Sequence, residues 1–234
     1  YFYRKNCYCR GLLHHNKLKN GFTLAEVLIT LGIIGVVAAL TIPTLIGNYQ
    51  KKEVAVRLQK MYNTIQNAIS QAELENGPSE TWIFKDETES KNFYDTQIKS
   101  KMKCAKTTSQ DCYLEDGSMI KLKRLSAYGL LETNFYPFAN KKALNYNGGK
   151  TNHRRYVFGY NVWLVPTQIG NKITPPKTEV TTMDRIAKDI TRDQLLNGPG
   201  KSNAPNEYCK AYGEASCFQL IKRDGWEIRK DYPW

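Results

Sequence analysis

The sequence predicts an α+β fold: a long N-terminal helix, half transmembrane and half amphipathic, packed on a small C-terminal antiparallel-sheet domain. Three observations predict it. An apolar stretch follows a short basic segment, and it continues into a stretch with helical spacing of apolar residues. Beyond that, short apolar runs beside Asp-Gly dipeptides favour strands and tight turns. The length of 234 residues suits one medium domain with an appendage.

The basic segment covers residues 1–21. It carries five of the 34 lysines and arginines and no acidic residue. The rest of the chain holds 29 basic and 22 acidic side chains, so +7 of the total net charge of +12 lies beyond this segment. Such a charge suits DNA or anionic surfaces, but a solvated cationic surface explains it more simply.

Residues 22–47 form an apolar stretch that we expect to cross a membrane as a helix. Apart from Glu26 it contains apolar residues, glycines, threonines and one proline. As a helix, residues 22–42 cover about 30 Å, which is the thickness of one hydrocarbon core. Because basic residues precede the stretch, the positive-inside rule places residue 1 in the cytoplasm and the bulk of the chain outside.

Residues 48–77 keep the helical period but become polar on one side. Apolar residues recur three or four positions apart in one stripe, which consists of Val54, Leu58, Met61, Ile65, Ile69 and Ala72. Charged and amide side chains occupy the other side, and Gly77–Pro78 is a strong stop signal. We therefore expect one helix of more than fifty residues whose amphipathic half continues into a globular head.

Residues 78–234 are expected to form an α+β head. Strands are predicted over residues 118–124, 155–165 and 217–222. Asp224–Gly225 is read as the turn of a terminal hairpin between residues 218–221 and 226–228. Helices are predicted near residues 90–100 and over 182–196, and a loop over 197–206.

Four cysteines of this head fall in two pairs, Cys104 with Cys112 and Cys209 with Cys217, each with seven intervening residues. Zinc sites favour closer spacing with further ligands nearby, so no metal is expected. Disulfides fit better. Three connectivities are possible, and we favour sequential pairing, which implies an oxidising compartment.

Two ordinary explanations compete for the apolar stretch. A secretory signal peptide would end at small residues such as Val37-Ala38-Ala39, but the apolar pattern continues past them. A plain membrane anchor explains the length and the flanking charge. It gives no reason for Glu26, however, because a carboxylate in hydrocarbon is costly unless it is paired or neutralised.

The residues around Glu26 supply a reason. Basic residues are followed by Gly-Phe-Thr-Leu-Ala-Glu at residues 21–26 and then by about twenty apolar residues. This pattern, covering residues 17 to about 76, resembles the class III signal of type IV pilins and type II secretion pseudopilins. The resemblance implies cleavage after Gly21 by a prepilin peptidase, N-methylation of Phe22 and a pilin-like fold. It also implies that Glu26 lies beside the new amine of a neighbouring subunit, where the two charges neutralise each other.

The resemblance also concerns Pro43. A proline inside a helix removes a backbone donor and loosens or kinks the helix. In pilin-like filaments a proline at this place accompanies local melting on assembly, although a simple kink at the edge of the bilayer explains Pro43 equally well. The sequence lacks the clear acidic loop of the calcium-binding major pseudopilins, so the resemblance supports neither calcium binding nor the role of a major subunit.

An enzymatic function is not expected either. Beyond residue 21 the one histidine is His153, and no neighbour in the sequence would orient it in a catalytic triad. With Arg154, Arg155 and Tyr156, it forms a basic cluster that is suited to phosphates and base stacking. DNA is therefore a candidate partner of the head, although a solvated loop explains the cluster more simply.

We therefore expect a structural pilin or pseudopilin subunit with no catalytic residue, cofactor or metal. Its expected partners are prepilin peptidase, other pilin or pseudopilin subunits, the inner membrane and an assembly platform, with DNA as a candidate. The precursor would lie in the cytoplasmic membrane as a single-pass protein, with its head outside. The filament would serve secretion, adhesion, motility or DNA uptake. The alternative is a membrane-anchored or exported ligand- or DNA-binding domain that does not polymerise.

Overall fold

A computed structural model describes residues 21–109, 111–125, 130–139, 153–163, 167–169, 172–174, 180–181, 191–198, 208–211 and 214–234. The chain divides into two compact units, Tyr1–Ile46 and Gly47–Trp234. Most of the helix predicted over residues 182–196, and most of the loop predicted over 197–206, lie outside the described residues.

Helix α1 (Leu24–Asn76) is one uninterrupted helix of 53 residues, as the sequence predicts. It ends where the stop signal was expected, because Gly77 adopts a φ of 79°, a left-handed conformation that disfavours other residues. All six residues of the predicted apolar stripe are buried in the head, together with Val54's neighbour Ala55 and with Ala68. The helical period therefore identified the face of α1 that enters the core.

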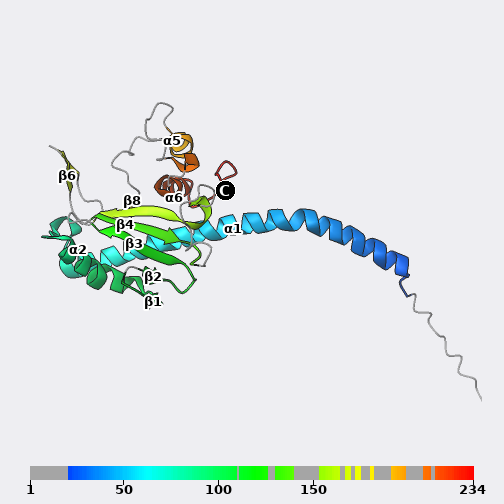
Figure 1. The fold of residues 1–234 in the computed structure, drawn as a ribbon, viewed down its shortest axis with the longest axis horizontal. Helices are drawn as coiled ribbons and strands as arrows, with labels where there is room; N and C mark the ends of the chain where they lie inside the picture. Colours follow the sequence, from blue (N-terminus) through cyan, green and yellow to red (C-terminus); the bar gives the residue numbers. More distant parts are fainter. Residues whose placement is uncertain are drawn as a thin grey trace, which may run out of the picture. The chain divides into compact units, whose positions relative to one another are not determined.

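The sheet of the head has six strands in the order β1-β2-β3-β4-β5-β8, and every neighbouring pair is antiparallel (Figure 1). The strands are β1 (Lys106–Thr107), β2 (Asp111–Tyr113), β3 (Met119–Leu125), β4 (Leu130–Tyr136), β5 (Phe158–Trp163) and β8 (Val180–Thr181). A separate two-stranded ribbon pairs β6 (Thr167–Ile169) with β7 (Lys172–Thr174). The predicted small antiparallel sheet is thus confirmed.

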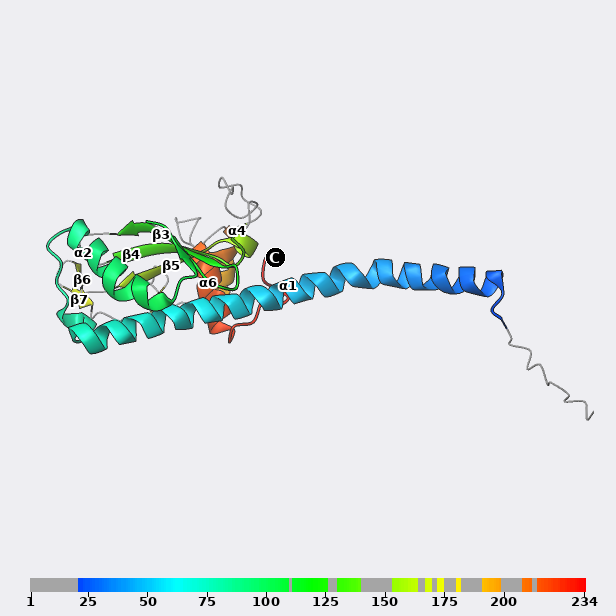
Figure 2. The same ribbon diagram turned by 90° about the horizontal axis from the view of Figure 1, so that it is seen from below.

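One cross-strand row of side chains forms the centre of the core. Cys112 is opposite Ile120, Ile120 is opposite Phe135, and Phe135 is opposite Phe158. All four are almost completely buried and belong to the same cluster as the apolar stripe of α1. The head part of α1 accordingly lies along one face of the sheet (Figure 2).

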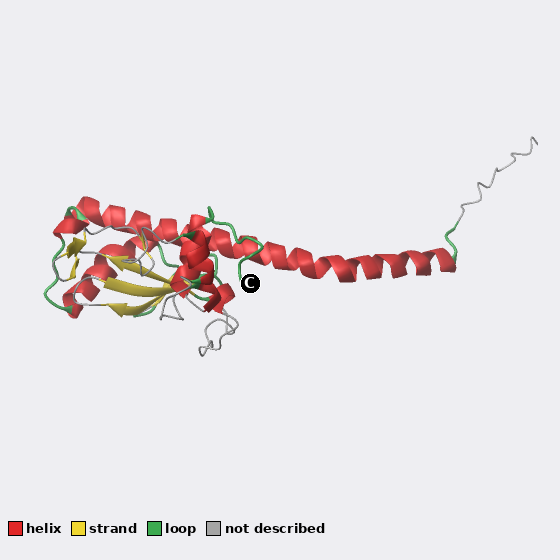
Figure 3. Ribbon diagram, turned by 90° about the horizontal axis from the view of Figure 1, so that it is seen from above, coloured by secondary structure: helices red, strands yellow, loops and turns green. Residues whose placement is uncertain are grey.

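Short helices complete the head around this sheet (Figure 3). They are η1 (Ser79–Thr81), α2 (Glu87–Phe93), η2 (Tyr94–Ile98), η3 (Lys99–Met102), α4 (His153–Tyr156), α5 (Arg192–Asn197), η4 (Cys209–Ala211) and α6 (Glu214–Arg223). Helix α2 lies at the end of the head where α1 terminates, and α4 lies at the other end of the sheet (Figures 1 and 2).

The strand predicted over residues 217–222 is wrong, because these residues belong to α6. The Asp224–Gly225 dipeptide is likewise not a hairpin turn. Gly225 has a φ of 74° and donates its N–H to the carbonyl of Lys222, while Trp226 donates to the carbonyl of Ile221. These two bonds form a Schellman motif, which ends a helix.

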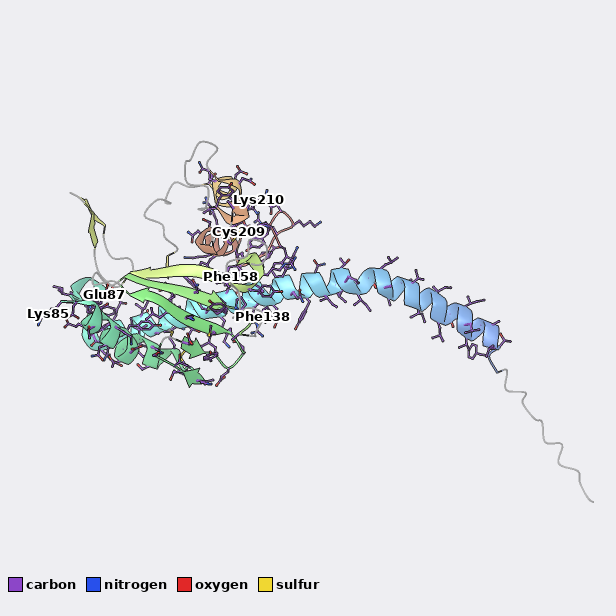
Figure 4. The ribbon with its side chains drawn as sticks, viewed as in Figure 1. Lys85, Glu87, Phe138, Phe158, Cys209 and Lys210 are labelled. Carbon is purple, nitrogen blue, oxygen red and sulfur yellow. A yellow bond between two sulfur atoms is a disulfide. The ribbon has the colours of Figure 1, made fainter. Side chains whose placement is uncertain are left out.

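Two disulfides link the sequential cysteine pairs. Cys104 bonds to Cys112 at the base of the hairpin of β1 and β2, and Cys209 bonds to Cys217, which joins η4 to α6. Figure 4 shows Cys209 beside α6. Each bridge closes a short loop within one local part of the head, so neither fixes the relation of distant segments.

Arg57 ties α1 to the sheet. Its Nη1 donates to the backbone carbonyls of Asp116, in the turn before β3, and of Pro137, just after β4, at 2.6 and 2.7 Å. Its Nε and Nη2 donate to Glu53 one helical turn earlier, and its guanidinium lies 4.7 Å from the ring centre of Phe138. One half-buried cation thus satisfies two carbonyls that are distant in the sequence.

A second cation, Arg192 at the start of α5, ties the C-terminal segments together. Its Nε and Nη2 donate to both carboxylate oxygens of Asp224 at 2.7 and 2.8 Å. Its Nη1 and Nη2 also donate to Asp231 at 2.7 and 2.9 Å. These charge-assisted bonds join α5, the end of α6 and the segment that follows α6.

Candidate processing and assembly site

The peptide bond between Gly21 and Phe22 lies in an exposed segment. Residues 21–23 precede α1 and have no regular secondary structure, and Phe22 is 87% exposed. A Cβ added at Gly21 would have no atom within 4 Å. A peptidase must reach the bond that it cleaves, and no residue in the described part of the chain crowds Gly21.

Glu26 is bonded within its own helix start. The backbone N–H of Thr23 donates to Glu26 Oε2 at 2.8 Å, and the Thr23 hydroxyl donates to the same oxygen at 2.9 Å. In return, the Glu26 N–H donates to Thr23 Oγ1 at 3.3 Å. This reciprocal arrangement is a capping box, which satisfies helix-terminal N–H groups that lack partners within the helix.

Sequence reasoning missed this capping box, although its signal was present. Thr23-Leu24-Ala25-Glu26 has the S/T-x-x-E spacing of the motif and stands directly before an apolar run. The carboxylate therefore has two functions to consider: it holds the first turn of α1 in an isolated chain, and it carries the charge expected to act in assembly.

The large apolar side chains of the N-terminal half of α1 are exposed. Large apolar side chains from Leu24 to Ile46 are 43% exposed or more, and the helix is long and apolar enough to cross a membrane. Two threonines within it bond to the helix backbone: the hydroxyl of Thr30 donates to the carbonyl of Val27, and that of Thr41 donates to the carbonyl of Val37. Such bonds lower the cost of placing threonines in hydrocarbon.

Pro43 lies inside α1 without ending it. Proline has no N–H, so the carbonyl of Ala39, four residues earlier, receives no helical bond from position 43. The helix is therefore weaker at this turn than elsewhere. Local melting at Pro43 on assembly stays a prediction.

The basic cluster of the head falls on α4. The side chains of His153 and Arg154 lie outside the described residues. Tyr156 is half-buried. Arg155 lies with its guanidinium carbon 5.2 Å from the ring centre of Trp234. DNA binding by this cluster stays a prediction. Among the described residues, no group of three or more His, Cys, Asp or Glu side chains is placed to hold a metal ion.

Two family models match the chain. The model of the prokaryotic N-terminal methylation motif, which is the class III prepilin signal, matches residues 16–42. The model of a family of unknown function (DUF6613) matches residues 44–234. No curated protein and no solved structure matches this chain. The expected class III signal is thus confirmed by a match that contains Gly21, Phe22 and Glu26 and that ends just before Pro43.

Proposed function

This chain belongs to a family of unknown function (DUF6613), and because a prepilin signal precedes the matched region, we propose that it is a pilin or pseudopilin subunit of a type IV pilus-like or type II secretion filament. Its N-terminal motif and its exposed apolar helix fit a membrane-anchored precursor. Prepilin peptidase cleaves it between Gly21 and Phe22, and α1 then assembles with other subunits. The filament serves secretion, adhesion, motility or DNA uptake.

The observation that supports this most strongly is the exposed junction followed by a capping box and an apolar helix. In the precursor, residues 1–21 lie in the cytoplasm, α1 crosses the inner membrane and the head lies outside. Cleavage creates an amine at Phe22, directly before Thr23 and four residues before Glu26. In the filament, the carboxylate of Glu26 pairs with the amine of a neighbouring Phe22, because the hydrocarbon surroundings strengthen the attraction between opposite charges.

Mass spectrometry of the mature protein tests the processing step. The chain is produced together with a prepilin peptidase and its methyltransferase activity, and the N-terminal peptide is sequenced. The expected product begins with N-methyl-Phe22. A start near Leu40 would instead indicate an ordinary signal peptide, and an unprocessed chain would support the alternative of an anchored domain that does not polymerise.

Two variants separate the two functions of Glu26. Glu26→Gln keeps an oxygen acceptor at the capping position but removes the charge, since glutamine also serves in capping boxes. Thr23→Ala removes the cap but keeps the charge. If charge pairing drives assembly, Glu26→Gln subunits are processed but fail to enter filaments, whereas Thr23→Ala subunits still enter. Normal assembly of Glu26→Gln would contradict the pairing.

A further inference from the structure

One tryptophan and two cations form a cluster in the part of the head where the apolar half of α1 ends. Two cations from different elements lie close to the ring of Trp234. Lys51 Nζ of α1 is 5.9 Å from its centre, and the guanidinium carbon of Arg155 of α4 is 5.2 Å from it. Trp234 and both cations are half-buried, so each keeps part of its surface open. In both ribbon views, α4 and the C-terminus lie together at this end of the head (Figures 1 and 2).

This cluster is close in sequence to the predicted membrane span. Lys51 follows Ile46, the end of the apolar stretch, by five residues of continuous helix, which is a rise of about 8 Å. Each headgroup layer of a bilayer is about 5–8 Å thick. With the hydrocarbon ending at Ile46, the last large apolar residue of the stretch, Lys51 therefore lies at the outer edge of the headgroup layer.

The residue types of this cluster suit that layer. Two further residues of α1 lie within about 3 Å of Lys51 along the helix axis: Tyr49 is 67% exposed, and Lys52 is exposed. Tyrosine and tryptophan prefer the membrane–water interface, and lysine and arginine are attracted to lipid phosphates. Glu53 is the acid nearest to Lys51 in the sequence, and it is bonded to Arg57 at 2.8 Å. Its negative charge is therefore balanced by Arg57, and it competes little with lipid phosphates for the lysines.

We propose that Lys51, Arg155 and Trp234 form a membrane-docking surface that binds anionic phospholipid headgroups in the unassembled subunit, with Tyr49 and Lys52 at nearly the same depth on α1. The lysines and Arg155 contact phosphates, and the ring of Trp234 lies at the level of the headgroups. The surface holds the head against the bilayer before the subunit leaves the membrane. This proposal rests on the membrane-spanning part of the proposed function and is independent of polymerisation.

Arg155 also belongs to the basic cluster considered for DNA. The membrane is favoured because Lys51 is carried to the edge of the headgroup layer by the helix that precedes it, whereas DNA would have to compete for a surface already next to the bilayer. The two partners make different predictions for Trp234, since docking on lipid places its ring within reach of a headgroup-attached quencher.

The test uses the full chain in vesicles. One vesicle type contains phosphatidylcholine alone and the other contains phosphatidylcholine and phosphatidylglycerol at about three to one, both with a nitroxide on a small fraction of the headgroups. The chain has four tryptophans, so the signal of Trp234 is the difference between the unchanged chain and Trp234→Phe. We expect at least twofold stronger quenching of Trp234 in the anionic vesicles than in the neutral ones.

Charge variants make the test specific. Lys51→Gln with Arg155→Gln should lower the quenching in anionic vesicles to the level in neutral vesicles, and Lys51→Arg with Arg155→Lys should retain it. The matched control is Lys85→Gln with Lys121→Gln, which removes the same charge from exposed positions elsewhere on the head. Figure 4 shows Lys85 at the end of the head away from Phe138. This control should quench like the unchanged chain.

Three results would overturn the proposal. Equal quenching of Trp234 in both vesicle types would mean that anionic headgroups are not bound. Equal losses in the double variant and its matched control would mean that only the net charge matters. If Lys51→Gln with Arg155→Gln abolished binding of a fluorescent DNA duplex and left the quenching by vesicles unchanged, the surface would be a nucleic-acid site. Near-UV circular dichroism of each variant checks that the head stays folded.

Discussion

Replacing Arg57 by methionine should destabilise the head more than any change of an exposed charge. Methionine keeps an apolar stem of similar length but removes the guanidinium. The carbonyls of Asp116 and Pro137 then lose donors at 2.6 and 2.7 Å, and Phe138 loses the cation over its ring. Pro137 is buried, so its carbonyl is poorly placed to bond to water instead.

The magnitude follows from these contacts. A hydrogen bond to a charged group contributes about 1.5–3 kcal/mol, and leaving a buried acceptor without a donor adds to its loss. Asp116 is only half-buried, so water replaces part of its bond. We therefore expect Arg57→Met to lower the free energy of unfolding by about 3 kcal/mol. The Arg57 side chain is 18% exposed, whereas that of Lys60, which also pairs with Asp116, is 52% exposed.

Lys60→Met is therefore the matched control. It removes a positive charge from the same helix and breaks a pair with the same residue, Asp116, at 2.9 Å. Exposed pairs of this kind contribute under about 1 kcal/mol. Urea unfolding of the full chain in a non-ionic detergent, followed by near-UV circular dichroism, measures both. Equal losses in the two variants, or a loss below about 1 kcal/mol for Arg57→Met, would refute the assignment of Arg57 as the link between α1 and the sheet.

Three further predictions concern other parts of the chain. Replacing Cys104 and Cys112 together by serine should lower the free energy of unfolding by about 2.5 kcal/mol, which is the chain-entropy value for so short a loop. Urea unfolding with and without reductant measures this loss, and an unchanged free energy of unfolding would contradict the prediction. The bonds from Arg192 hold the pKa of Asp231 below its usual range. The stability from this pair is therefore fully present above the unfolded pKa of about 3.9 and is lost as the pH falls through the lower folded pKa. In an acid titration, Asp231→Asn should reduce the pH dependence of the free energy of unfolding in that range, and an unchanged curve would refute the coupling. Thr23→Ala should destabilise the first turn of α1 by about 1 kcal/mol, which would appear as roughly fivefold faster hydrogen exchange of its amides, and unchanged exchange would rule out the cap.

The sequence predicted α1 well because two independent signals agree along it. The stripe from Val54 to Ala72 repeats with the helical period, and Gly77 supplies the stop. All of that stripe is buried. The apolar half was recognisable from composition and length alone, and the residues around Gly21 and Glu26 carry their own motif.

The end of the chain shows why other elements were misassigned. Cys-Phe-Gln-Leu-Ile at residues 217–221 is too short an apolar run to separate a buried strand from a helix by period. The choice then depended on Asp224–Gly225, and a glycine with positive φ serves a hairpin turn and a Schellman helix end equally well. Residue type alone does not decide between them.

Contacts between distant segments were beyond local reasoning. Arg57 receives its carbonyl acceptors from positions 59 and 80 residues further along the chain. Nothing in the residues around Arg57 identifies those partners, because they depend on the strand order of the sheet. The capping box of Thr23 and Glu26 is the opposite case, since it was readable from four residues.

In the proposed filament, the capping box would make docking an exchange of partners for Glu26. Before docking, Glu26 is not an unpaired acid, because two neutral donors of Thr23 already bind one of its oxygens. A neighbouring amine adds the positive charge that those donors lack, so docking releases the difference between two bonded states and not the whole cost of a bare carboxylate. In the proposed filament, a gain of that smaller size is reversible. An unassembled subunit would then be a stable species in the bilayer, not a strained intermediate that must assemble at once.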